Sequence, residues 1–251
     1  MARTTSLTWT QYSALWDAWV HDFLQSPEPL LIDGRPAVAF NNLADFVVRY
    51  GRSTFAIMLE YGARRAAAEL GTRPYLLGVI GQADLRNVSL AGQLPVDGIT
   101  GYGLLPNWLG APIQSYSVLI EQRVSDWEQM QRRLDKPFYP VACVGWDASA
   151  RGDSSITGLY ARGYPYAPVV TGVTPELFGT FIDRALEFNA RWMPRDNLIF
   201  LHAWNEWTES SAIEPSDRYG ESFLDQIRRR SGNGAHISSV AGAPRITPAS
   251  P

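Results

Sequence analysis

The sequence has a single cysteine, Cys143, and only three histidines, His21, His202 and His236. One cysteine cannot form an internal disulfide, and it excludes the zinc sites that several cysteines build. The histidines are scattered along the chain and lack the short spacing of a metal-binding motif. We therefore expect no metal and no other cofactor.

Charge is also sparse, and Lys136 is the only lysine. Charged residues make up 19% of the chain, and the formal net charge is −3 at pH 7. This balance lacks the positive surface that nucleic-acid binding needs, so we expect no nucleic-acid partner. We attribute the use of arginine in place of lysine to genomic bias rather than to function.

Long apolar runs are missing. No segment approaches the roughly 18 apolar residues of a membrane-spanning helix, so no membrane span is expected. The opening Met-Ala-Arg-Thr-Thr-Ser-Leu lacks the apolar core, about 7–15 residues long, of a secretory leader. These absences predict a soluble cytoplasmic protein.

The chain does have ample material for one sizeable core, because 45% of its 251 residues are hydrophobic. Its pattern predicts strands near residues 37, 75, 98, 138 and 198, and helices over 9–24, 43–70, 115–134, 174–192 and 221–230. Strands that alternate with helices predict an α/β fold with a parallel sheet. We expect one domain over residues 1–230. Residues 231–251 are rich in Gly, Ser, Pro and Ala and lack periodicity, which predicts a disordered tail.

The most informative stretch runs from Leu198 to Pro215. It begins as an unbroken apolar run, which is typical of a strand buried on both faces, and it ends in aromatic and carboxylate side chains. Strand alternation would put one set of side chains on one face, namely Phe200, His202, Trp204 and Glu206, and the other set on the opposite face, namely Leu201, Ala203, Asn205 and Trp207. In a parallel α/β fold, substrates bind at the carboxyl ends of the strands. The stretch therefore predicts the rim of an active site.

Two carboxylates of this rim, Glu206 and Glu209, are three positions apart. A bend after Trp207 would bring both into one pocket, in the roughly 5–9.5 Å range of paired glycosidase carboxylates. Trp204 and Trp207 offer flat apolar faces on which sugar C–H groups can stack. The alternative is that each glutamate caps the next helix or pairs with one of the many arginines. We favour the catalytic interpretation because the pair lies between two tryptophans at the end of a buried strand.

The same residues resemble a known family. Trp204-Asn-Glu-Trp-Thr-Glu209, Ile213-Glu-Pro215, Tyr219-Gly220 and Phe223-Leu224 are similar to the C-terminal strand and helix of glycoside hydrolase family 99-like, WbsX-type proteins. The resemblance implies a (β/α)8 barrel. It implies endo-α-mannosidase or α-mannanase activity in the family proper, whereas the WbsX branch is encoded near polysaccharide loci and is often labelled glycosyltransferase.

Roles for individual residues follow from this resemblance. It implies that Glu206 deprotonates the sugar 2-hydroxyl, which then attacks the anomeric carbon, and that Glu209 is the acid/base at the glycosidic oxygen. It also implies substrate contacts for Asn205 and Glu214 of the motif. This chain departs from the pattern at Thr208, where the hydrolases proper favour His, and at Ser210, where Gly is usual.

A second motif, Gly145-Trp-Asp147, resembles the family's Pro-Gly-Trp-Asp-Asn and follows the strand predicted near 138. Trp146 and Asp147 therefore fall where a barrel strand meets substrate, although Asp147 could instead cap a loop. The loop over residues 148–171 is long enough to predict a functional lid, with three tyrosines, Tyr160, Tyr164 and Tyr166.

Three further positions are candidates for contacts with a glycan. Asn41, at the end of the strand near 37, has the right side chain to hold a sugar hydroxyl, but asparagine also favours turns. Tyr102 lies between Gly101 and Gly103 and could face a pocket, because glycines in a strand often mark a close approach. We expect His202 to be a hydrogen-bonded core residue that supports the site rather than a catalyst.

Five predicted strands are fewer than the eight of a closed barrel. By resemblance, the chain from about Leu30 aligns with the C-terminal two-thirds of the family's barrel, and the early strands, with their Trp-Ala-Asn-Glu-Asn-Trp-like stretch, have no counterpart. We therefore expect an incomplete (β/α)8 TIM-barrel type fold. The lacking strands would come from a missing N-terminal segment or from another chain, as in a homo-oligomer.

The expected function is a retaining glycoside hydrolase that acts on a mannose-type or cell-surface polysaccharide through Glu206 and Glu209. One alternative is a WbsX-type glycosyltransferase of polysaccharide biosynthesis. The sequence has neither an Asp-x-Asp pair nor a phosphate-binding glycine-rich loop, which favours the hydrolase. Another alternative is an inactive remnant that binds glycans.

Overall fold

The structure is a computed structural model in which residues 7–81, 84–103, 105–153, 155, 163–193 and 198–231 are described. Apart from its first residue, the predicted disordered tail lies outside the described residues, and so does His236. Tyr160 of the predicted lid lies outside them as well.

A parallel sheet forms the centre of the molecule. Its strands are β2 (Arg35–Phe40), β3 (Tyr75–Ile80), β4 (Gly98–Gly101) and β6 (Phe138–Tyr139), adjacent in that order. The two-residue strand β1 (Leu31–Ile32) pairs antiparallel with the outer edge of β2. Every residue of β3 is buried, as expected for a strand covered on both faces.

The parallel arrangement of strands continues in a second, two-stranded sheet. After Pro140, which has no N–H to donate, the strand of β6 resumes as β7 (Val141–Cys143), and β7 pairs in parallel with β9 (Phe200–His202). All five predicted strand positions are therefore present, and the α/β class with parallel strands is confirmed. No closed barrel is formed by the described strands.

The helices agree with the sequence pattern in most places. They are α1 (Trp9–Trp19), continued by a π-helical turn (Val20–Leu24), α2 (Leu43–Tyr50), α3 (Arg52–Leu70), α4 (Leu85–Gly92), α5 (Tyr116–Gln131), α6 (Pro175–Trp192) and α7 (Ser222–Arg230). The single helix predicted over 43–70 is wrong, because Gly51, with φ +77°, separates α2 from α3. The helix α4 was not predicted, although Asp84 caps it by accepting a hydrogen bond from the Asn87 N–H at 2.8 Å.

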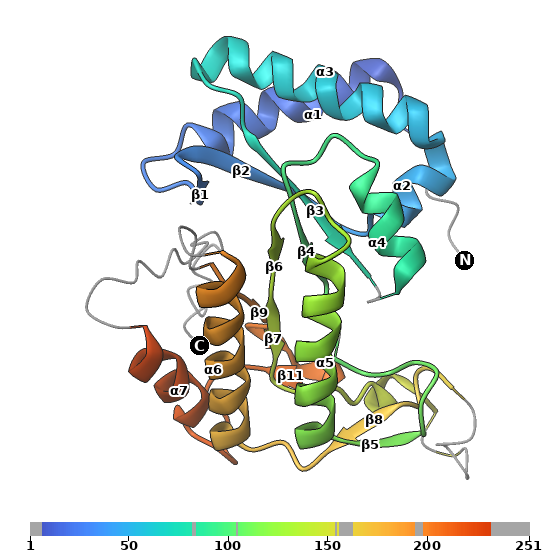
Figure 1. Ribbon diagram of the computed structural model, residues 1–251, viewed down its shortest axis with the longest axis vertical. Coiled ribbons are helices and arrows are strands. Elements are labelled where there is room, and N and C mark those ends of the chain that lie inside the picture. The colour runs from blue at the N-terminus through green and yellow to red at the C-terminus, as the bar shows by residue number, and fades with distance from the viewer. Residues whose placement is uncertain are drawn as a thin grey trace, which may run out of the picture.

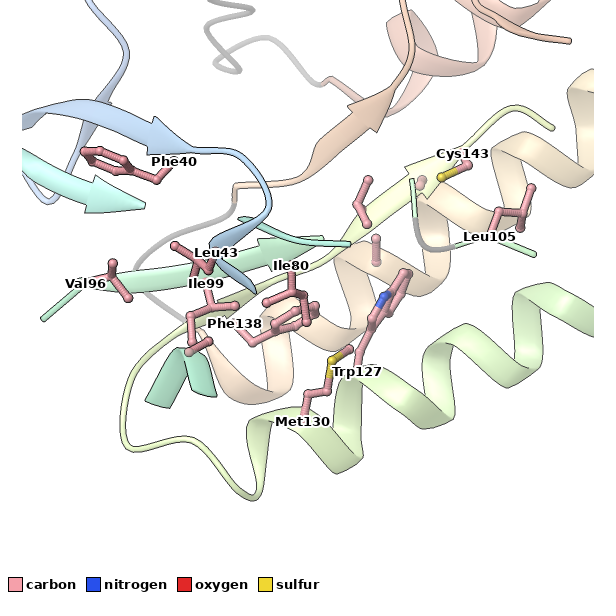
Figure 2. Packing of buried hydrophobic residues seen from close by; sticks show 14 of the residues in the cluster. Phe40, Leu43, Ile80, Val96, Ile99, Leu105, Trp127, Met130, Phe138 and Cys143 are labelled. Carbon is pink, nitrogen blue, oxygen red and sulfur yellow. The ribbon is translucent and has the colours of Figure 1, made fainter. Parts of the chain in front are cut away.

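Helices and sheet bury one large core. Figure 1 shows α5 and α6 side by side, with α7 against α6. In Figure 2, Ile80 and Ile99 of the sheet lie beside Phe138, in the buried cluster that also includes Trp127. Trp127 of α5 is fully buried and stacks on Phe181 of α6, with ring centroids 5.4 Å apart. Because α6 also packs against β7, the pair of helices covers the β7–β9 sheet as well.

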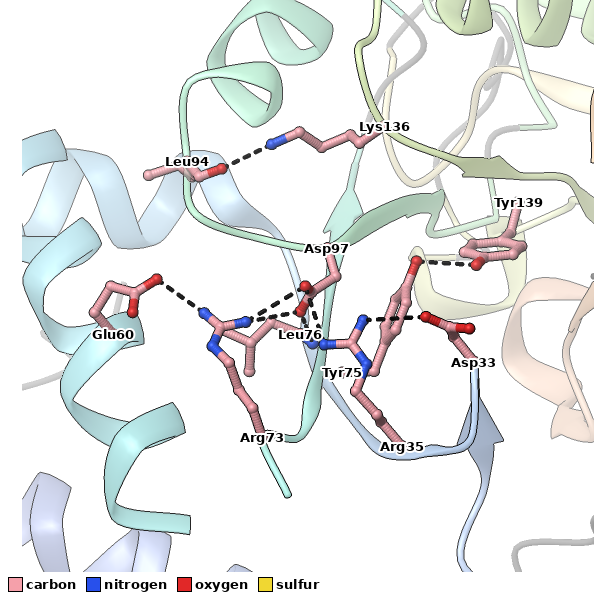
Figure 3. A network of polar contacts seen from close by, with 10 residues as sticks. All are labelled: Asp33, Arg35, Glu60, Arg73, Tyr75, Leu76, Leu94, Asp97, Lys136 and Tyr139. Atoms are coloured by element: carbon pink, nitrogen blue, oxygen red, sulfur yellow. Dashed lines mark hydrogen bonds and ion pairs between the residues drawn. The ribbon is translucent and has the colours of Figure 1, made fainter. Parts of the chain in front are cut away.

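At the amino ends of the central strands, Asp97 organises a polar network (Figure 3). Its Oδ2 accepts the Leu76 N–H at 2.7 Å, and its carboxylate forms ion pairs with Arg35 and Arg73, each at 3.2 Å. The network ties β2, β3 and the start of β4 together.

Shorter elements lie near the carboxyl ends of the strands. They are β5 (Ile113–Ser115), paired in parallel with β8 (Val169–Thr171), the hairpin of β10 (Asn205–Glu206) and β11 (Ser211–Ala212), and two 3₁₀ turns, Ser149–Arg151 and Trp207–Glu209. Among the described residues, no helix has both the length and the apolar character needed to cross a bilayer.

Candidate active site

A tight hairpin carries both candidate catalytic carboxylates. The strand β9 ends at His202, and the chain then forms the pair β10–β11, with Glu206 opposite Ser211. The 3₁₀ turn Trp207–Glu209 joins the two strands and ends at Ser210, whose φ of +50° is left-handed. This conformation suits glycine best and is less favourable for serine. The strand predicted to run on to Trp207 is therefore wrong beyond His202.

The bend brings Glu206 and Glu209 to one guanidinium group, that of Arg151. Arg151 Nη2 donates to Glu206 Oε1 at 2.8 Å, and Arg151 Nη1 donates to Glu209 Oε1 at 2.7 Å. Thr208 Oγ1 donates to Glu206 Oε1 at 2.7 Å and accepts from Arg151 Nη2 at 2.7 Å. The two carboxylates therefore lie within the span of one guanidinium. The alternative in which the glutamates pair with an arginine is realised in this structure.

The two carboxylates have different surroundings. The Glu206 side chain is 32% exposed, whereas that of Glu209 is 8% exposed. Glu209 Oε2 is buried and has no hydrogen-bond partner within the described part of the chain. Burial raises the pKa of Glu209, and the charge of Glu206 adds to this, while Arg151 acts in the opposite direction. Glu209 is thus more easily kept protonated than an ordinary glutamate.

Behind the carboxylates lies a buried His202. Its Nδ1 is 3.1 Å from Ser211 Oγ, and its Nε2 is buried without a partner among the residues that are described. Burial lowers the pKa of His202, so the ring is neutral at pH 7. Tyr102 packs edge-on against this ring at 4.8 Å, and burial together with the charges of Glu209 and Glu206 raises the pKa of its phenol. The structure therefore brings Tyr102 and His202 to the carboxylate pair.

The remaining residues of the motif form the exposed rim. Trp204 and Trp207 are 55% and 50% exposed, and Asn205 is exposed as well. The Trp207 indole Nε1 donates to Glu214 Oε2 at 2.7 Å, which fixes the orientation of the ring. Two large aromatic faces are thus open to a ligand beside Glu206 and Glu209.

A pocket of about 780 Å³ adjoins the same turn. It is lined by Trp146, Asp147, Trp207 and Ser210, among others, but not by either glutamate. The Asp147 N–H donates to the Glu209 carbonyl oxygen at 2.7 Å, and Asp147 Oδ1 accepts the Ser149 N–H at 2.9 Å. Asp147 therefore caps the loop, as one interpretation of the sequence had it, and it also faces the pocket.

The structure does not place Asn41 near Glu206 and Glu209. It is an exposed residue at the carboxyl end of β2, whereas the carboxylates follow β9, and β3, β4 and the β6–β7 strand intervene. No contact links it to the carboxylate pair within the described structure.

Arg151 was missed by the sequence interpretation. It lies 58 positions from Glu209, so no local pattern connects the two. The only signal was the loop predicted as a lid. There, Tyr164 accepts a hydrogen bond from Arg151 Nη1 at 3.0 Å and packs near Trp108, with ring centroids 6.4 Å apart.

The described residues contain no group of three or more His, Cys, Asp or Glu side chains arranged to hold a metal ion. The candidate site is thus a pair of carboxylates with different exposure, one arginine, a buried neutral histidine and several open aromatic rings. Such a set can transfer protons at a bound sugar.

Comparisons with known proteins lead to the same family that the sequence motifs resemble. Residues 107–227 match the family described as glycosyltransferase WbsX. The uncharacterized protein WxcX of Xanthomonas campestris pv. campestris strain B100 is 27% identical over 113 residues, which are 42% of this chain and 15% of WxcX. WxcX of the strain ATCC 33913 matches to the same extent.

The fold is similar to that of a solved enzyme. Two structures of the GH99 endo-α-mannosidase from Bacteroides thetaiotaomicron, one of them in complex with bis-tris propane, superpose with TM-scores of 0.54 and 0.53 at 14% identity. Each superposition covers 87% of the residues of this chain, but only 63% and 59% of the residues of the two mannosidase chains. The chain therefore spans less than two thirds of the length of these structures and a small part of WxcX.

Proposed function

We propose that this protein is a glycan-processing enzyme of the retaining glycoside hydrolase type. The chain resembles the WbsX family in sequence and GH99 endo-α-mannosidases in fold. Its substrate is a mannose-type or cell-surface polysaccharide. The observation that carries the proposal is the pairing of Glu206 and Glu209 on one guanidinium. Two carboxylates held so close, with unequal exposure, suit the two proton transfers of such an enzyme.

In the proposed reaction, Glu206 takes the proton of the sugar 2-hydroxyl as that oxygen forms a bond to the anomeric carbon. Glu209 gives its proton to the departing glycosidic oxygen, and the raised pKa of Glu209 supports this role. Water then attacks the anomeric carbon and opens the ring formed there. Glu209 takes a proton from the water and Glu206 returns its proton to the 2-oxygen, so both carboxyl groups regain their starting states and the configuration is retained.

Other residues of the site have supporting roles in this proposal. Trp204, Trp207 and Trp146 offer faces for sugar rings, and Asp147, Asn205, Glu214 and Tyr102 offer hydrogen-bonding groups. His202, neutral and buried, holds the hairpin through Ser211 rather than reacting. We assign no role to Asn41 in this site.

We further propose that the described strands are five consecutive strands of an incomplete (β/α)8 barrel. In support, β2, β3, β4, β6–β7 and β9 are parallel, in chain order, and each is followed by helical or loop segments as in a barrel. The GH99 chain is longer than this one, which leaves room for the other strands. They would be supplied by further residues of the same protein or by another chain.

The proposal is tested by Glu206→Gln and Glu209→Gln on mannan-type oligosaccharides, with release of reducing sugar as the readout. Loss of one proton-transfer group should lower the rate by about 10²–10⁴-fold without unfolding the protein. Glu187→Gln, at an exposed glutamate of α6 that pairs with Arg184, is the matched control and should keep full activity. Undiminished turnover by either site variant would contradict the assignment.

The family description favours one second candidate, a WbsX-type glycosyltransferase. The same cleft would then bind a nucleotide sugar. A clear rise in melting temperature with UDP- or GDP-sugars, and none with oligosaccharides, would favour the transferase. Glycan binding without turnover in either assay would favour the inactive remnant.

A further inference from the structure

One arginine that lines the pocket beside Trp207 has no charged partner. The guanidinium of Arg218 lies 4.9 Å from the centroid of the Tyr219 ring and forms no ion pair with a described residue. Ten of the described arginines behave differently, because they form ion pairs to Asp or Glu: Arg35, Arg65, Arg73, Arg123, Arg132, Arg151, Arg184, Arg191, Arg228 and Arg230. An unpaired guanidinium at a pocket wall is free to bind an anion.

The position of Arg218 is held by its neighbour. The Tyr219 hydroxyl donates to the Val173 carbonyl oxygen at 3.1 Å, and the Tyr219 N–H donates to Ser216 Oγ at 3.2 Å. The ring under Arg218 is therefore held at its hydroxyl end, and the backbone that carries it is held by Ser216. A cation stacked on an anchored ring loses less side-chain freedom when it binds a ligand.

The other walls of the pocket suit a sugar. Trp146 and Trp207 contribute indole rings, and Val170 and Phe223 contribute apolar surface. Asp147 contributes a carboxylate that can accept hydrogen bonds from sugar hydroxyl groups. The volume of about 780 Å³ is in the range of small-molecule sites. Trp207 also precedes Glu209 on the same turn, so a glycan in this pocket adjoins the carboxylate pair.

We propose that this pocket is a subsite for an acidic sugar, with Arg218 binding the carboxylate of a uronic acid residue. This inference rests on the proposed function and narrows its substrate class to glycans that carry uronic acid. The planar guanidinium presents two parallel N–H donors, which match the two oxygens of a carboxylate. A neutral hexose has a hydroxymethyl group at the same position and cannot form that pair.

The test compares an oligosaccharide that contains glucuronic acid with the same oligosaccharide after reduction of its carboxyl group to hydroxymethyl. Binding to the full chain is measured by calorimetry, with the tryptophan indole signals followed by NMR. The acidic form should bind the wild type at least about tenfold more tightly, which corresponds to one charge-assisted pair. Arg218→Gln should bind the acidic form only as tightly as the neutral form. Arg218→Lys should keep part of the difference in affinity between the two forms.

Arg229→Gln is the matched control, because Arg229 is an exposed arginine of α7 outside the pocket and its loss changes the net charge equally. Equal affinity of the acidic and neutral forms for the wild type would overturn the inference, and so would equal losses in the Arg218 and Arg229 variants. Either result leaves the proposed hydrolase intact, because that proposal is tested by the turnover of the Glu206→Gln and Glu209→Gln variants and not by the affinity for acidic glycans.

Discussion

Arg151 satisfies only one of the two oxygens of Glu209. Its Nη1 donates to Oε1 at 2.7 Å, while Oε2 is buried and has no hydrogen-bond partner among the described residues. A buried carboxylate oxygen without a donor is unfavourable, so this oxygen favours a proton or a donor brought by a ligand. A proton on Oε2 is what the proposed role of Glu209 as the acid at the glycosidic oxygen requires.

Arg151→Gln should raise the pKa of Glu209 further. The guanidinium stabilises the charged carboxylate and so lowers its pKa, whereas burial raises it. When the positive charge is removed, burial remains and the pKa must increase. The measurement is an NMR titration of the carboxyl carbon in protein labelled at glutamate, assigned with Glu209→Gln. Arg151→Lys keeps the charge and should shift the pKa less, while an unchanged or lower value in Arg151→Gln would contradict the ion pair.

His202 and His21 should titrate on opposite sides of the ordinary histidine pKa. Burial lowers the pKa of His202, whereas a hydrogen bond from His21 Nδ1 to the Asp22 carboxylate, at 2.7 Å, raises the pKa of the exposed His21. Because the unfolded chain then binds a proton at position 202 more readily than the folded one, His202 should contribute to a loss of stability as the pH falls through about 6.5.

Ring-proton NMR titrations measure both histidines in one sample. The midpoint of His202 should lie below about 6.5 and that of His21 above it. Asp22→Asn should lower the midpoint of His21 and leave that of His202 unchanged. A His202 midpoint at or above the ordinary value would show that the ring is not buried as described.

The sequence predicted the strands of the sheet better than the site. The five strands were recognisable because their apolar runs are local patterns. The bend that brings Glu206 and Glu209 together was considered as a possibility after Trp207, but their spacing did not require it. Arg151 could not be found in this way, because a contact between residues 55 positions apart leaves no periodic signal. Tertiary pairing, not local pattern, decides which arginine a carboxylate meets.

Short elements were missed for a related reason. The strands β5 and β8 have three residues each, too few for alternation to be visible, and they form only because they pair with one another. The hairpin after His202 was hidden because its turn residue, Ser210, is not the glycine that usually signals a left-handed position.

Ser210→Gly should therefore stabilise the protein. A serine in the left-handed region carries a backbone penalty that glycine avoids, and the greater freedom of glycine in the unfolded chain offsets part of the gain. We expect an increase of about 0.5–1 kcal/mol in the free energy of unfolding, measured by urea denaturation. Ser125→Gly, at an exposed helical serine of α5, should instead destabilise by about 0.5 kcal/mol. A loss of stability in Ser210→Gly would contradict the left-handed conformation.

Asp97→Asn should destabilise the protein by about 1–3 kcal/mol, because charge-assisted hydrogen bonds are lost. The asparagine oxygen can still accept the Leu76 N–H, but the amide cannot balance the charges of Arg35 and Arg73, which both lie at 3.2 Å from the carboxylate (Figure 3). The matched control is Asp33→Asn, which removes the same charge from a side chain that is 76% exposed and 3.9 Å from Arg35. We expect the control to change stability by less than about 0.5 kcal/mol. Urea denaturation of both variants measures the difference, and equal effects would mean that Asp97 acts only through net charge and does not join β2, β3 and β4.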